Sequence, residues 1–142
     1  MKGAHLKKVF GIAAAALALT LGLSTPASAA DHTHHMHTGD VWGNISGWSG
    51  EGVFTEEGDR VHICDVDADG YAVIMFVYKG APATGYILYS FHVGGEGTCA
   101  TKSAADGGIH NLPEGRIGFK FCRYKDSHDS ECKDYDFLND NS

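Results

Sequence analysis

Residues 116–122 read Arg-Ile-Gly-Phe-Lys-Phe-Cys, a stretch in which every second side chain is apolar. Successive side chains of a β-strand point to opposite faces, so the isoleucine and the two phenylalanines share one face. Cys122 falls on the other, more polar face, and the alternation of residues 61–64 places Cys64 in the same way. The pattern predicts strands with one buried face. It favours disulfides at the periphery of the fold over a buried bridge between two sheets.

Several further stretches have this strand character, and clusters of Gly, Pro and Asp separate them. Beyond the first 30 residues no stretch shows the 3.6-residue spacing of a helix. We therefore expect an all-β protein, a single small antiparallel β-sandwich of immunoglobulin-like type. Residues 71–78 are apolar on both faces, as in a central strand that is covered on both sides. The expected strands are residues 60–65, 71–79, 86–93, 116–123 and 133–138.

The last of these strands lies in an acidic tail and is expected to be an edge strand protected by its charge.

The chain has four cysteines, an even number that indicates two disulfides in a small exported domain. Three pairings are open. We expect Cys122 to pair with Cys132 and close a polar loop, which leaves Cys64 and Cys99 as the second bridge.

The first 30 residues have the features of a secretory signal peptide. Three lysines precede an apolar run over residues 9–23, and small residues follow, so cleavage is expected after Ala29 or Ala30. The run is shorter than the roughly 20 residues that cross a bilayer. Removing this segment takes the formal charge from −7 to −10, because it contains three lysines and no acid. We therefore expect a secreted, extracellular protein. Because the mature chain is so acidic, nucleic acid and membrane surfaces are poor candidates as its partners.

Residues 31–50 differ in composition from the rest of the mature chain, since they are rich in His, Gly and Trp. They offer little apolar area against the entropy cost of ordering. We expect a flexible arm over residues 31–50, followed by the β-sandwich domain over residues 51–142.

Four histidines within six residues make this arm a candidate metal site. Imidazole binds copper, nickel or zinc. The simpler interpretation is a solvated polar tract, and on that interpretation the protein has no cofactor. If cleavage follows Ala29, the terminus Ala30-Asp31-His32 also forms a square-planar chelate for copper(II) or nickel(II). The candidate ligands are His32, His34, His35 and His37.

The arm also has the features of a docking segment, because large apolar residues stand beside flexible backbone. The alternative is that both tryptophans cap the core of this domain. The candidate partner-binding residues are Val41, Trp42, Ile45 and Trp48.

Residues 65–70 begin like a calcium loop, but the twelfth position that needs a bidentate Glu is Phe76. A turn stabilised by aspartate side chains is therefore expected. No nucleophile, base and orienting group occur in a recognisable set, so the sequence indicates a protein that is not an enzyme.

Short motifs of the domain resemble small secreted, two-disulfide β-sandwich proteins of actinobacteria such as Streptomyces. They are Cys64-Asp65, Ala68-Asp69-Gly70, the turn over residues 112–116 and Phe121-Cys122-Arg123. The chain is also similar to the adaptor subunit of the umbrella-shaped antibacterial toxin particles of Streptomyces. That resemblance implies lectin-like and toxin subunits as partners.

Three functions follow as expectations. The first is a secreted, non-catalytic protein-interaction module, with an adaptor or assembly role in an extracellular antibacterial toxin complex. The second is extracellular metal binding through the histidine cluster. The third is inhibition of a secreted protease by an exposed loop such as residues 94–99.

Overall fold

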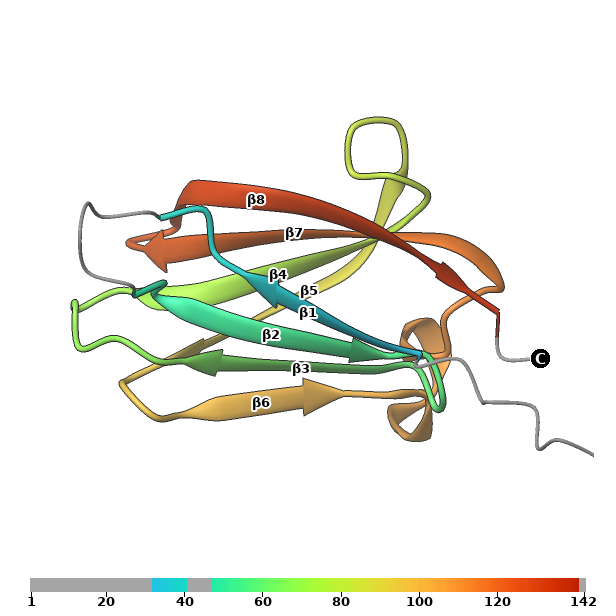
Figure 1. Ribbon diagram of the computed structural model, residues 1–142, viewed down its shortest axis with the longest axis horizontal. Helices are drawn as coiled ribbons and strands as arrows, with labels where there is room; N and C mark the ends of the chain where they lie inside the picture. Colours follow the sequence, from blue (N-terminus) through green and yellow to red (C-terminus); the bar gives the residue numbers. More distant parts are fainter. Residues whose placement is uncertain (1–31, 41–46, 141–142) are drawn as a thin grey trace, which may run out of the picture.

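The computed structural model describes residues 32–40 and 47–140, which form two antiparallel sheets of four strands each (Figure 1). The first sheet has the order β1-β2-β3-β6 and the second the order β5-β4-β7-β8. The first sheet contains β1 (Thr33–His37), β2 (Gly50–Thr55), β3 (Arg60–Asp65) and β6 (Cys99–Lys102). The second contains β4 (Ala72–Lys79), β5 (Tyr86–Gly94), β7 (Gly115–Lys125) and β8 (His128–Asn139). Two short 3₁₀ turns, η1 (Ala104–Asp106) and η2 (Gly108–His110), precede β7.

The centre of the sandwich has the connectivity of an immunoglobulin-like domain. Strand β3 pairs with β6 in one sheet, and β4 pairs with β7 in the other, so the chain crosses between the sheets after β3, after β5 and after β6. The predicted all-β antiparallel sandwich is confirmed. At the right-hand end of Figure 1, the start of β1, the turn between β2 and β3, the end of β8 and the two 3₁₀ turns lie together.

The core is built from the alternating apolar residues that the sequence indicates. Phe119 and Phe121 on β7 are fully buried, and Phe54 on β2 packs against Phe119 with its ring centroid 4.9 Å away. Strand β2 faces the core with glycines at two positions because the Phe121 ring fills their space. A Cβ atom on Gly50 would lie 2.8 Å from Cζ of Phe121. These glycines therefore belong to a strand and not to a flexible linker.

The expected flexible arm over residues 31–50 is wrong for the part that the structure describes. Thr33–His37 form β1, which pairs with β2 in the register His35↔Val53. The sandwich therefore begins at residue 33, and not at residue 51. Pairing of β1 with β2 and the burial of Met36 offset the conformational entropy that this segment loses on ordering. Residues 41–46 lie outside the described part.

The structure corrects the sequence-based expectations for two further strands, β6 and β4. The four-residue β6 was missed because it is short and polar, and it is placed by its pairing with β3. Strand β4 is central in its sheet, as expected, but the opposing sheet covers only its Val73, Met75 and Val77 face. On its other face Ile74 is buried while its neighbours there are half-buried.

Candidate functional site

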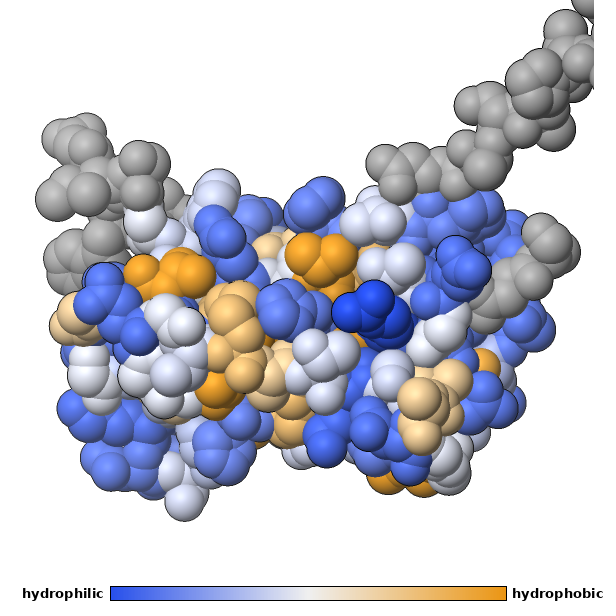
Figure 2. Space-filling view, turned by 90° about the horizontal axis from the view of Figure 1, so that it is seen from below, coloured by the Kyte–Doolittle hydropathy of each residue, from blue (hydrophilic) through white to orange (hydrophobic). Residues whose placement is uncertain are grey.

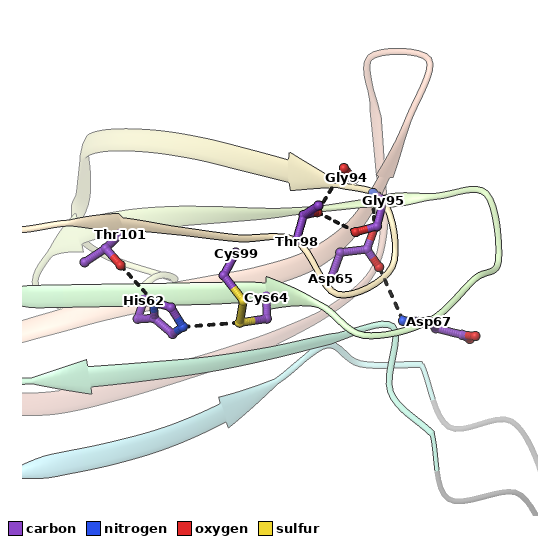
Figure 3. Close-up of a disulfide and its surroundings, with 9 residues drawn as sticks. All are labelled: His62, Cys64, Asp65, Asp67, Gly94, Gly95, Thr98, Cys99 and Thr101. Atoms are coloured by element: carbon purple, nitrogen blue, oxygen red, sulfur yellow. Dashed lines mark hydrogen bonds between the residues drawn. A yellow bond between two sulfur atoms is a disulfide. The ribbon is translucent and has the colours of Figure 1, made fainter.

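The two disulfides pair as the sequence predicts, Cys64 with Cys99 and Cys122 with Cys132. Each joins neighbouring strands of one sheet, so neither bridges the two sheets, as expected, although Cys122 itself is fully buried. His62 lies on the first bridge, with Nε2 3.2 Å from Sγ of Cys64 and Nδ1 2.8 Å from Oγ1 of Thr101 (Figure 3). This bridge holds the short β6 on β3.

The aspartate-rich turn after β3 is a structural turn, as expected. The buried carboxylate of Asp65 accepts a hydrogen bond from the amide of Gly95 at 2.7 Å (Figure 3). The amide of Gly97 donates to the carbonyl of Asp65 at 2.8 Å. Asp69 instead turns to Arg123, 2.8 Å away. The aspartates do not converge as calcium ligands. The loop of residues 94–99 is folded back on Asp65.

The four candidate metal ligands of the arm divide between two faces of β1, because neighbouring side chains of a strand alternate. His34 points towards the core and stacks on Phe137 at 4.2 Å between ring centroids. His35 is exposed on the opposite face. The structure brings His32 and His34 together but separates them from His35 and His37.

His37 is engaged in contacts of its own. Nζ of Lys133 is 2.8 Å from its Nε2, and since an ammonium group only donates, this nitrogen accepts. Its Nδ1 then donates to the carbonyl of Thr38 at 2.7 Å. The indole of Trp48 stacks on the ring at 4.0 Å between centroids. Both nitrogens of His37 are thus used within the fold.

The Glu56 carboxylate joins the other two histidines. Glu56 follows β2 and is only 4% exposed. Its two oxygens lie 2.7 Å from Nδ1 of His32 and 2.7 Å from Nε2 of His34. An ionised carboxylate only accepts, so both imidazoles donate to it. Burial raises the pKa of Glu56, but the hydrogen bonds from His34, His32 and the Asp140 amide outweigh it and lower the pKa to about 2.

Asp140, directly after β8, completes this cluster from the other end of the chain. Its Oδ1 lies 3.6 Å from Nδ1 of His32, and its amide donates to Oε2 of Glu56 at 3.4 Å. A cleft of about 490 Å³ opens beside the cluster. It is lined by His32, Asp140, Glu57, Gly58, Asp59, Ala104 and Asn111.

Of the predicted partner-binding residues, only Trp48 lies in the described part; Val41, Trp42 and Ile45 lie outside it. The Trp48 side chain is exposed and lines a groove of about 260 Å³ on the outer face of β1 and β2. Its ring packs on His37 and not into the core, so the alternative of a core cap does not apply to this tryptophan.

The two edge strands of the second sheet differ in chemistry. Strand β8 carries alternating acids and a lysine along its length, as expected for an edge protected by charge. Strand β5 has nine residues and no Asp, Glu, Lys or Arg. Tyr86 is 60% exposed and Ile87 52%. Within residues 32–40 and 47–140, no backbone hydrogen bond joins the outer edge of β5 to another segment.

Seen from below, the molecule shows hydrophobic residues grouped near the middle of this face with hydrophilic residues around them (Figure 2). Strand β6 is the lowest strand in Figure 1, and β5 packs near it across the sandwich.

The open β5 edge was not identified from the sequence, although the absence of charge in residues 86–94 was a visible signal. Glu56 and Asp140 were also missed, and no local pattern marks them.

No family model, curated protein or solved structure matches this chain. In the described part of the chain, no helix is both long enough and apolar enough to cross a membrane.

Proposed function

We propose that the protein is a secreted, non-catalytic interaction module that binds another exported protein through the edge of β5. The observation that carries this proposal is the contrast between the two edges of one sheet. Strand β8 is protected by charge, whereas β5 is longer than most strands, uncharged and open. The signal peptide expected from the sequence and the two disulfides support an extracellular location.

The other two sheet edges are poorer sites. Strand β6 has only four residues. Strand β1 lies beside β8, where the hydroxyl of Tyr135 accepts a hydrogen bond from the amide of His37 at 2.9 Å. The amide of Gly39 likewise donates to the carbonyl of Glu131 at 2.7 Å. Strand β5 is therefore the edge that offers a partner the longest run of unpaired backbone.

A strand added at an open edge gains affinity from main-chain hydrogen bonds and specificity from alternate side chains. Tyr86 and Ile87 would supply apolar contact at the start of this edge, with burial of each exposed part contributing roughly 1 kcal/mol. The partner is accordingly an extended segment of another exported protein. An adaptor or assembly subunit of an antibacterial toxin complex is the particular role that the sequence resemblance suggests.

The test uses Ile87 and a matched residue on the opposite edge, Leu138 of β8, which is 57% exposed. A photo-reactive amino acid at position 87 should cross-link to another exported protein in the culture medium of the source cells, and one at position 138 should not. Ile87→Lys should lower co-elution with that protein at least tenfold, while Leu138→Lys leaves it unchanged.

Three results would oppose the proposal. The protein elutes alone as a monomer; the two variants lose the partner equally; or position 87 cross-links only to a second copy of this chain. Circular dichroism of both variants checks that the sandwich is retained.

A further inference from the structure

The cluster around Glu56 brings together groups from three distant parts of the chain. His32 precedes β1, Glu56 lies in the turn between β2 and β3, and Asp140 follows β8. Backbone bonds hold the first two in place, since the amide of Glu56 donates to the carbonyl of His32 at 3.0 Å. The cluster is therefore a product of the folded sandwich, and not of the histidine tract.

The spacing of the donor atoms suits a metal ion. Nδ1 of His32, a carboxylate oxygen of Glu56 and one of Asp140 lie within 4.8 Å of one another. Two of the separations are 2.7 and 3.6 Å. Ligands bound at 2.0–2.2 Å in a tetrahedral zinc site are separated by about 3.4 Å. Both of these separations are within about 1 Å of the tetrahedral value.

We propose that His32, Glu56 and Asp140 bind a zinc ion, with His34 as the residue that orients Glu56. One imidazole and two carboxylates form a nitrogen and oxygen donor set that zinc accepts. Two negative charges match the charge of the ion. Nδ1 of His32 gives up its hydrogen on binding, and a neutral imidazole does so by shifting that hydrogen to Nε2.

His34 has the geometry of a supporting residue. Its Nε2 donates to Oε1 of Glu56, while Oε2 faces His32 and the Asp140 amide. Stacking on Phe137 fixes the plane of the His34 ring. Such a partner holds the ligating carboxylate in one orientation, which commonly changes metal affinity 10- to 100-fold.

The fourth coordination position faces the cleft of about 490 Å³, because His32 and Asp140 both line it. A water molecule or a small anionic ligand reaches the ion from that side. This arrangement distinguishes the site from the four-histidine tract expected from the sequence, in which His35 and His37 would be ligands.

The experiment is an isothermal calorimetric titration with zinc chloride. The sample is the exported protein after treatment with a chelator. We expect a single site with micromolar or tighter affinity. Asp140→Asn removes a ligand that is half-exposed, so the fold is retained and affinity falls at least tenfold. The matched control is His35→Ala, which leaves affinity within twofold.

Cobalt(II) supplies a second readout that does not depend on heat. The wild-type protein should give the visible absorption of a four-coordinate ion, and Glu56→Gln should abolish it while circular dichroism shows an intact sandwich. A dissociation constant weaker than 100 µM, or equal losses in His35→Ala and Asp140→Asn, would overturn the proposal. Equal losses would show that the tract binds the metal as an unstructured set of imidazoles.

Discussion

Nη2 of Arg123 lies 2.8 Å from the carboxylate of Asp69, and this contact joins β7 to the turn before β4. The guanidinium also lies over the ring of Tyr71, 3.9 Å from its centroid, and near the buried Asp40. Asp40 in turn accepts a hydrogen bond from the amide of Ser49 at 2.9 Å. Arg123 is thus the cation shared by several acidic groups at one end of the sandwich.

Removing this cation should destabilise the protein strongly. Arg123→Leu leaves Asp40 and Asp69 without their positive partner in a largely buried position, so we expect the free energy of unfolding to fall by about 3 kcal/mol. The matched control is Arg116→Leu, whose pair with Asp136 is exposed and should contribute less than about 1 kcal/mol. Urea unfolding measures both. Equal losses would show that Arg123 has no special structural role.

Acid should weaken the same contact. Burial raises the pKa of Asp69, but hydrogen bonds from Ser49, the Tyr71 amide and Arg123 outweigh it and lower the pKa below its usual value. A carboxyl with a lower pKa in the folded state contributes stability above its unfolded pKa and loses it as the pH falls. Between pH 5 and pH 2.5 the wild type should therefore lose more stability than Asp69→Asn. The control is Asp67→Asn at an exposed position, which should lose as much stability as the wild type over this pH range. An equal loss of stability in Asp69→Asn would refute the prediction.

The docking of the segment after β1 can be tested at Gly39. A Cβ atom there would lie 2.5 Å from the carbonyl oxygen of Cys132 and 2.7 Å from that of Glu131, both backbone atoms of β8. Gly39→Ala should cost about 1–3 kcal/mol, which exceeds the gain from a stiffer unfolded chain. Gly47→Ala meets no atom within 4 Å and should be neutral or slightly stabilising. If thermal unfolding gives the two variants the same midpoint, this segment does not pack on β8 in solution.

The two disulfides should differ in their contribution to stability. Replacing Cys64 and Cys99 by alanine opens a loop with a sequence separation of 35, and chain entropy predicts a loss of about 4 kcal/mol. For Cys122 and Cys132 the separation is 10 and the expected loss is about 3 kcal/mol. Denaturant unfolding gives the ranking. A larger loss for the second pair would mean that the burial of Cys122 outweighs loop length.

Much of the sandwich was predictable because alternation is a local property. Strands β3, β4, β5 and β7 lie where the apolar pattern indicated them, and β8 begins five residues before the expected residue 133. Strands β1 and β2 were missed because His and Gly are weak strand formers on their own. Gly52 suits a strand only because Phe121, about 70 positions later, fills the space above it.

The sequence by itself determined the fold class and most of the strands, since periodicity and composition are written along the chain. It left three cysteine pairings open, and the structure has the one that we expected. Tertiary structure alone decided which groups meet. It separated His35 from His34, brought Glu56 and Asp140 to His32, and left β5 as the open edge. The reason is physical: side-chain alternation can be predicted over a few residues, whereas contacts between distant segments depend on how two whole sheets pack.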